Sequence, residues 1–247
     1  MHLFEEILDG LTHFDTRFLR TLNVLFTRPG ELSNAYFHGG RSRYTKPLSL
    51  FIIINVLFFF IQPHTYLFGY KYAQYVSIPR YADAVHQHLR VSGESDSVYA
   101  GRFNENLQHQ KKSILLFAVP VLAFAMWLVF LGSGRTYAEH LVFSVQVYAF
   151  FLAYLAVAGL LVLAPLMFGL MRLFPAATGQ LRLLGSESTI DSVLLAGLLA
   201  YFYLGLRRAY LTSRVRSIAS GAILSAVVVL TIVGYHTVLF YLTFWTT

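Results

Sequence analysis

The stretch RPGELSNAYFHGGRSRYTKPLSLFIIINVLFFFI, residues 28–61, decides the fold. From Pro47 onward it is an apolar run typical of a helix that crosses a membrane, and proline suits the first position of such a helix. Four cations precede the run, and cations beside a span hold that end on the cytoplasmic side. We therefore predict that they fix the orientation, while Gly39 and Gly40 let the chain turn into the crossing helix.

The composition indicates that a lipid bilayer is the solvent. Of the 247 residues, 56% are hydrophobic and 13% are charged, and the charged share of a soluble domain is about 25%. The net charge of +7 lies mostly beside apolar runs, which favours anionic lipid over nucleic acid as the partner. The chain has no cysteine, which excludes disulfides, thiolate metal sites and a cysteine nucleophile.

The distribution of apolar runs predicts an all-α fold, a polytopic membrane helix bundle with about five transmembrane helices. Residues 1–46 are expected to form an amphipathic helix and a basic elbow on the cytoplasmic side. Residues 47–247 form the bundle, which includes a polar extracytoplasmic loop at residues 62–112. The predicted spans are Pro47–Ile61, Ser113–Leu131, Tyr137–Leu170, Thr189–Leu206 and Ser217–Trp245.

The N-terminal segment predicts an interfacial helix, because apolar residues recur at steps of three and four with acids and arginines on the other face. A second interpretation is a helix that packs on the rest of the protein. The apolar positions are Phe4, Ile7, Leu8, Leu11, Phe14, Phe18, Leu22, Leu25 and Phe26.

Cations near the ends of the spans predict the orientation. They gather in the N-terminal segment and between the fourth and fifth spans, so both segments are expected to be cytoplasmic. An odd number of spans then places the C-terminus outside. Lys111 and Lys112 argue the other way, but a long loop contributes little to orientation.

Several motifs, in order, resemble a family of proteins. FLRTL, then LFTRPGELSNAYFHGGRSRYTKP, an apolar run and RTYAEHLVFSVQVYAFF resemble a widespread bacterial family of multi-pass inner-membrane proteins of unknown function. The resemblance implies a bacterial inner-membrane location and supplies no activity. Many relatives begin with a zinc ribbon, which this cysteine-free chain lacks. Where relatives carry two histidines after the EH pair of Glu139 and His140, this chain has Gln146 and Tyr148.

The third predicted span carries the main candidate site. At 100° per residue, Glu139 aligns with Gln146, and His140, Ser144 and Tyr148 form the neighbouring stripe. Polar groups within a membrane usually face a bundle interior, a cavity or another subunit. The two stripes therefore predict a polar pathway that opens on the cytoplasmic side.

Some of these polar residues also have structural interpretations. TYAE at residues 136–139 fits a capping box, in which Glu139 would serve only to start the helix. Asn55, in the middle of the first span, either bonds to a neighbouring helix or lines the pathway. No GxSxG, HExxH or glycine-rich phosphate motif is present, so we assign no catalytic residue, metal or cofactor, and whether the chain is an enzyme stays open.

The basic elbow offers a second candidate site, for a lipid headgroup. Arg41, Arg43, Tyr44 and Lys46 would grip a phosphate, although orientation anchoring also explains these cations. Small residues recur every fourth position in the last two spans, which favours close helix packing within the chain or between subunits, and hence a homo-oligomer.

Three functions follow from these features. The first is a homo-oligomeric channel or permeation protein with a pathway along the third span. The second is a lipid-headgroup binder or membrane enzyme that uses Glu139 and His140. The third is a membrane scaffold or assembly partner that binds other proteins through its outer loop and N-terminal helix.

Overall fold

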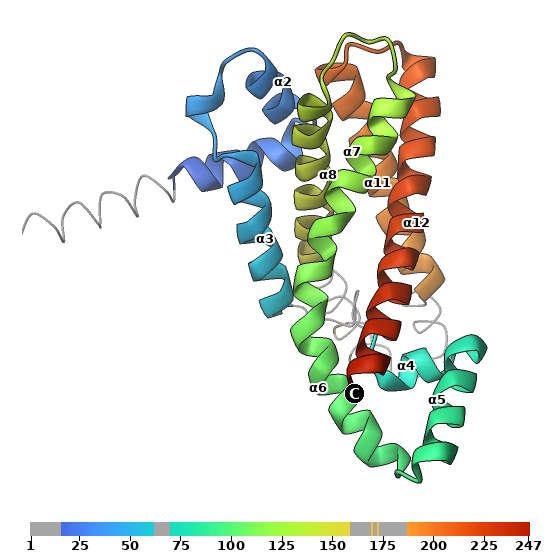
Figure 1. The fold of residues 1–247 in the computed structure, drawn as a ribbon. Coiled ribbons are helices and arrows are strands. Elements are labelled where there is room, and N and C mark those ends of the chain that lie inside the picture. The colour runs from blue at the N-terminus through green and yellow to red at the C-terminus, as the bar shows by residue number, and fades with distance from the viewer. Residues whose placement is uncertain (1–15, 62–69, 159–168, 170–171, 173–186) are drawn as a thin grey trace, which may run out of the picture.

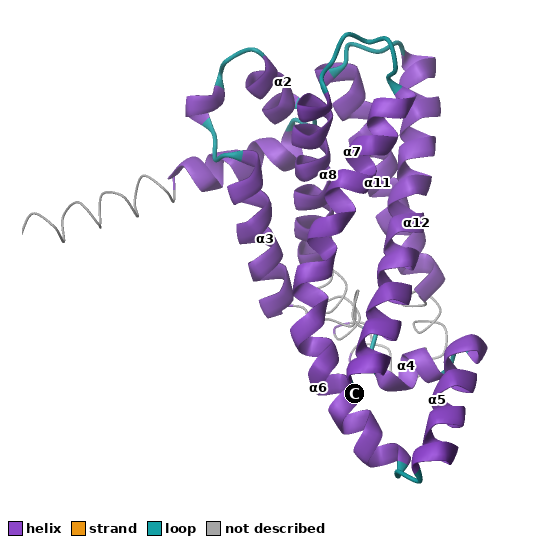
Figure 2. Ribbon diagram, in the orientation of Figure 1, coloured by secondary structure: helices purple, strands orange, loops and turns teal. Residues whose placement is uncertain are grey.

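The computed structural model describes residues 16–61, 70–158, 169, 172 and 187–247, with the side chains of residues 41, 112–115 and 187–190 left out. Every regular element in these ranges is helical (Figure 2), which confirms the all-α class. The first fifteen residues of the amphipathic segment and the predicted end of the third span after residue 158 lie outside the described residues.

Five helices run along a common axis and form the bundle (Figure 1). They are α3 (Pro47–Ile61), α7 (Ala118–Val129), α8 (Tyr137–Val157), α11 (Glu187–Ala209) and α12 (Arg214–Thr246). Helix α8 is central: it packs against α3, α7 and α11, and most of its residues are buried.

Three of these helices are long and apolar enough to cross a membrane, which indicates a multi-pass membrane protein. They are α8, the part of α11 from Asp191 onward, and α12. The other two predicted spans correspond to shorter apolar helices, α3 with 15 residues and α7 with 12. The prediction of about five transmembrane helices is thus confirmed in part, with three candidate spans within the described residues.

The outer faces of the bundle carry large apolar side chains, among them Phe60 on α3 and Leu230 on α12, which are 78% and 69% exposed. The inner faces combine large buried rings, such as those of Phe143 and Phe202, with small residues. On α12, Gly221 approaches α11 so closely that an added Cβ would lie 3.4 Å from Phe202 Cβ. The small-residue ridge predicted on the last span therefore serves packing within the chain.

A helical cap covers the lower end of the bundle in Figure 1. It comprises α4 (Tyr72–Val76), α5 (Pro79–Ser92) and α6 (Asp96–Ile114), and α6 continues through the 3-10 turn Leu115–Phe117 into α7. Helix α12 has 33 residues, about 50 Å at 1.5 Å each, and therefore extends beyond a hydrocarbon layer of about 30 Å. Its last turns pack on the cap, where the Tyr81 and Phe240 ring centroids are 4.3 Å apart.

The opposite end of the bundle is named here the basic end, and it comprises residues 16–43 and the connections at residues 130–136 and 210–213 (Figure 1). The helix at residues 16–27 lies across the bundle axis and buries Thr21 and Leu25. The Phe26 ring lies 5.4 Å from that of Phe150 on α8. The predicted apolar face of the helix at residues 16–27 thus packs on the rest of the protein, although Leu19 remains 63% exposed.

The predicted basic elbow contains a helix that we did not expect, α2 (Glu31–Phe37), followed by the 3-10 turn Arg41–Arg43. Pro29 and Gly30 end the first helix, but Gly30, with φ of +81°, also starts α2, and Glu31 supplies the acidic first turn that helices favour. Helix α2 packs against α8 and α11. The elbow is therefore part of the bundle at its basic end.

Candidate functional site

The start of α8 is fixed by a capping box. The Thr136 backbone N–H donates to Glu139 Oε2 at 2.8 Å, and the Glu139 backbone N–H donates to the Thr136 hydroxyl at 3.4 Å. The structure confirms this interpretation of Glu139. Its other carboxylate oxygen accepts a hydrogen bond from Arg135 at 3.1 Å.

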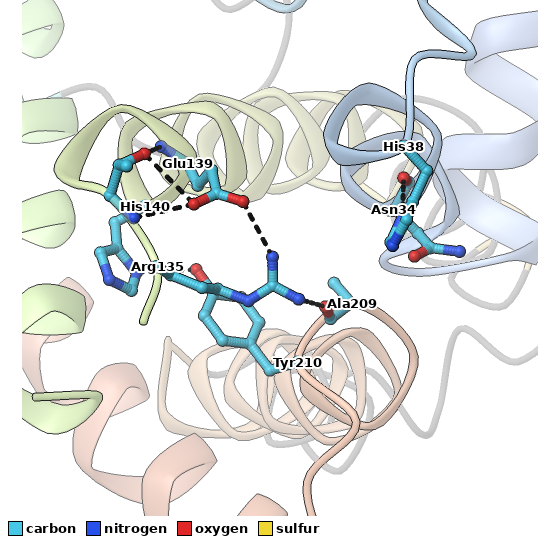
Figure 3. A network of polar contacts seen from close by, with 8 residues as sticks. Asn34, His38, Arg135, Glu139, His140, Ala209 and Tyr210 are labelled. Atoms are coloured by element: carbon cyan, nitrogen blue, oxygen red, sulfur yellow. Dashed lines mark hydrogen bonds and ion pairs between the residues drawn. The ribbon is translucent and has the colours of Figure 1, made fainter. Parts of the chain in front are cut away.

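Arg135 connects three elements at the basic end (Figure 3). Its guanidinium donates to Glu139 on α8 and, at 2.5 Å, to the carbonyl of Ala209 at the end of α11. It also lies over the rings of Phe37 and Tyr210, 4.5 and 4.8 Å from their centroids. Arginine suits this position because its planar group stacks and donates at once.

His140 lies directly below this cluster and is fully buried. Its Nδ1 is 2.8 Å from the Tyr210 hydroxyl, and its ring is stacked on those of Phe130 and Tyr210. Burial raises the pKa of Tyr210, an effect that the nearby Glu139 carboxylate adds to and Arg135 opposes. The phenol therefore stays protonated and is able to donate to His140.

Gln146 faces a different side of α8. Its Oε1 accepts a hydrogen bond of 2.6 Å from the Ser33 hydroxyl of α2, and both side chains are buried. This bond joins residues 113 positions apart in the sequence. The bond fixes α2 against α8 and orients the Gln146 side-chain amide. Because the bond uses only Oε1, the two N–H donors of Nε2 remain available for another acceptor.

A cavity of about 390 Å³ lies beside this hydrogen bond, between the 32–47 segment and the helices α3 and α8. We name it the elbow pocket. It brings together Tyr44 and Lys46, predicted to hold a headgroup, and Gln146, predicted to line a pathway. The lining residues are Leu32, Tyr36, Gly40, Ser42, Tyr44, Thr45, Lys46, Pro47, Leu50 and Gln146.

Of the other two predicted headgroup residues, Arg43 is not among the described residues of this lining. Arg43 is exposed at the basic end, and the side chain of Arg41 lies outside the described part of the chain. Asn55 is 9% exposed and lies on the buried face of α3, the helix that packs on α8. It is not among the residues that line the elbow pocket.

The second polar stripe of α8 faces the bundle interior. Ser144 is fully buried and its hydroxyl contacts the Met126 sulfur of α7 at 3.5 Å, while Tyr148 is buried one turn further along. The two stripes, adjacent on the predicted helix, thus meet different neighbours: Gln146 meets α2, and Ser144 meets α7. No group of three or more His, Asp or Glu side chains that could hold a metal occurs in the described residues.

Sequence analysis missed Ser33, Arg135 and Tyr210. Ser33 and Arg135 lie within the quoted strings, but the role of each of the three residues depends on a partner distant in the sequence. Ser33 bonds to Gln146, Arg135 to Ala209, and Tyr210 to His140. The RTYAEH string did contain one usable signal, since an arginine four residues before Glu139 is at ion-pair spacing.

The Ser33–Gln146 bond gives a first prediction. Replacing Gln146 with leucine leaves the buried Ser33 hydroxyl without its acceptor, which costs about 1–3 kcal/mol in unfolding free energy. The Ser33→Ala, Gln146→Leu double variant should recover part of this loss, because both polar groups are then removed together. Unfolding in mixed micelles measures the four free energies of the cycle, and strictly additive losses would contradict the coupling.

Comparison with known protein families finds one similarity, which lies in the N-terminal part of the described chain. A family model described as "protein of unknown function (DUF3667)" matches residues 15–59. The match includes FLRTL and the RPG–RYTKP stretch, and it ends before the RTYAEHLVF string. Neither the curated proteins nor the solved structures contain a match. Over helix 16–27, α2, the elbow and most of α3, the chain is therefore similar to a protein family of unknown function.

Proposed function

We propose that this multi-pass membrane protein binds the headgroup of an anionic lipid in the elbow pocket. The observation that supports this most directly is the composition of the cavity, which contains a lysine and a buried amide at the basic end of the bundle. Basic pockets between membrane helices on the cytoplasmic side bind such headgroups. The second of the three functions that the sequence leaves open is also a lipid-headgroup binder, but it uses Glu139 and His140. The present proposal uses Lys46 and Gln146 in their place and includes no catalytic step.

The lining suits both parts of a lipid. Lys46 supplies a positive charge, Ser42 and Thr45 supply hydroxyls, and the Gln146 Nε2 group has no hydrogen-bond partner among the described residues. Leu32 and Leu50 are apolar and are placed to contact the glycerol and the first acyl carbons. The site thus offers charge-assisted donors for a phosphate next to apolar surface.

The proposal includes an orientation, with the basic end and the N-terminus in the cytoplasm and the cap and C-terminus outside, in a bacterial inner membrane. Cations from distant parts of the chain gather at this end: Arg208, for example, donates to the Pro29 carbonyl at 3.1 Å and lies 3.9 Å from Glu31. Such a concentration is typical of the cytoplasmic side. A homo-oligomer that shields the exposed face of α11 is compatible with this arrangement.

The placement of the polar stripes makes the lipid site a better explanation than a channel. A single water-filled vestibule along α8 would need the side chains of Gln146 and His140 to face the same space. Instead, Gln146 bonds to α2, while His140 bonds to Tyr210 on another side of α8. The scaffold hypothesis gains no specific support from the described residues.

Retention of lipid by the Lys46→Gln variant tests the proposal. Protein purified from nanodiscs that contain phosphatidylglycerol should keep a bound anionic lipid in native mass spectrometry. Removing the Lys46 charge costs about 1 kcal/mol and should lower occupancy roughly fivefold. Arg43→Gln removes an equal charge from the same surface, outside the pocket lining, and should change occupancy little. Equal losses in both variants would mean general surface attraction and contradict a pocket.

A further inference from the structure

The interior of the bundle contains buried polar atoms that lack partners. In the described ranges, four buried side-chain atoms have no hydrogen-bond partner: the hydroxyls of Tyr99, Tyr148 and Ser225, and Nε2 of His140. Tyr99 belongs to the cap, and the other three belong to α8 and α12. An unpaired buried polar atom costs about 1–3 kcal/mol, and native proteins usually satisfy such atoms with internal water. Three of them in one helix bundle therefore call for a common explanation.

Two of these atoms share one face of α8. His140, Ser144 and Tyr148 follow one another at steps of four, and all three side chains are fully buried. The Cβ atoms of residues four apart on a helix are about 6 Å from each other, so the three polar side chains follow one another along one line of the helix surface. The face therefore presents a continuous row of buried polar groups, of the kind that internal water satisfies.

The protein groups nearest to this face do not replace such waters. Ser144 contacts only the Met126 sulfur, at 3.5 Å, and a thioether is a weak acceptor. The Thr231 hydroxyl of α12 lies close to Tyr148, but it donates its proton to the Val227 carbonyl at 2.7 Å and forms no well-aligned hydrogen bond with the phenol. Polar capacity on both sides of the face thus remains for water.

The face extends deep into the bundle. Tyr148 lies eleven residues from the first residue of α8, which begins at the basic end. Its position is therefore about 16 Å inside the bundle, close to the middle of a layer of about 30 Å. His140 marks the outer end of the face, near Arg135, Glu139 and Tyr210, and Arg216 lies over the Phe130 ring at 5.5 Å.

We propose that the His140–Ser144–Tyr148 face of α8 binds a chain of internal water molecules that connects the basic end to the middle of the bundle. The ligand is water, and the chain gives protons a route between the His140 imidazole and the Tyr148 hydroxyl. The route is distinct from the elbow pocket, on another side of α8, and does not depend on lipid binding there.

Engineered cysteines test the proposal directly, since the natural chain has no cysteine. A thiol reacts as its thiolate, which needs water, so reactivity reports hydration. Ser144→Cys is nearly isosteric, and Ala149→Cys is its matched control, because Ala149 is an equally buried small residue on another face of α8. Ala222→Cys, exposed on α12, controls for reagent that arrives through the lipid.

In proteoliposomes treated with 2-aminoethyl methanethiosulfonate, intact-protein mass spectrometry should show that Ser144→Cys reacts at least roughly tenfold faster than Ala149→Cys and Ala222→Cys. Equal rates at all three positions would overturn the water chain. The melting temperature of Tyr148→Phe supplies a second readout. It should fall if the phenol binds water, whereas a dry, unpaired hydroxyl would make the phenylalanine variant more stable, which would also overturn the proposal.

Discussion

Replacing Gly30 with alanine is expected to destabilise the folded protein by about 3 kcal/mol or more, the largest single effect of any small substitution at the basic end. Two penalties act together. Gly30 has φ of +81°, in the left-handed region that other residues avoid, and an added Cβ would lie 2.5 Å from the Gly205 carbonyl oxygen of α11. Neither backbone can retreat without moving α2 or α11 from the bundle.

Gly39 is a matched control for this substitution. It has a similar φ of +86°, but nothing lies within 4 Å of an added Cβ. Gly39→Ala should therefore show only the backbone penalty, about 1 kcal/mol. Unfolding of both variants in mixed micelles, followed by tryptophan fluorescence, measures the difference, and equal losses would show that the contact between Gly30 and Gly205 carries no energy.

The Gly30 variant should also affect the elbow pocket. Moving α2 away from α11 displaces Ser33, which lies in the first turn of α2 and bonds to Gln146. Since Gln146 and Leu32 line the pocket, lipid retention should fall together with stability. Gly39→Ala should leave retention close to that of the natural protein, because the side chain it adds meets open space.

The helix positions follow from the sequence to a large extent. The predicted first span, Pro47–Ile61, coincides with α3, because proline marks its start and the apolar run sets its length. The capping box at residues 136–139 is also found. These features depend on neighbouring residues, and local patterns carry that information.

The contacts that build the candidate site could not be derived in the same way. Helix α2 was missed because its seven residues are too few for a periodic pattern, and it exists through its packing on α8 and α11. The assignment of Gln146 to one side of α8 and Ser144 to another depends on the order of the helices around α8. Hydrophobic periodicity gives the angle between two stripes, but it does not say which helix each stripe meets.

Replacing Arg135 with glutamine is expected to lower the free energy of unfolding by about 3 kcal/mol, the second large effect.

 The variant loses two kinds of interaction. The first is hydrogen bonds from a charged donor, each worth about 1.5–3 kcal/mol, and the second is stacking on two rings. The Arg135 side chain is 19% exposed. Its guanidinium donates to the Ala209 carbonyl at 2.5 Å and lies over the rings of Phe37 and Tyr210. Glutamine keeps a polar group but loses the charge, the fork of donors and the stacking surface.

The Arg135→Lys variant separates charge from geometry. Lysine retains the positive charge beside Glu139, but an ammonium group cannot donate to Glu139 and Ala209 while it also stacks on both rings. We expect it to recover less than half of the loss. Arg102→Gln is the control, since that arginine also pairs with a glutamate, Glu94, but is 49% exposed and should cost about 0.5 kcal/mol.

Thermal unfolding in detergent, compared across these three variants, measures the contribution of Arg135. Full recovery by lysine would contradict a role for geometry and leave only charge. The same variants also report on His140, because Arg135 stacks on Tyr210 and the Tyr210 hydroxyl bonds to the imidazole. If Arg135 holds Tyr210 in place, the NMR resonances of the His140 ring should shift in Arg135→Gln and Arg135→Lys, because Tyr210 contacts both Arg135 and His140. They should stay unchanged in Arg102→Gln, since Arg102 pairs with Glu94 in the cap.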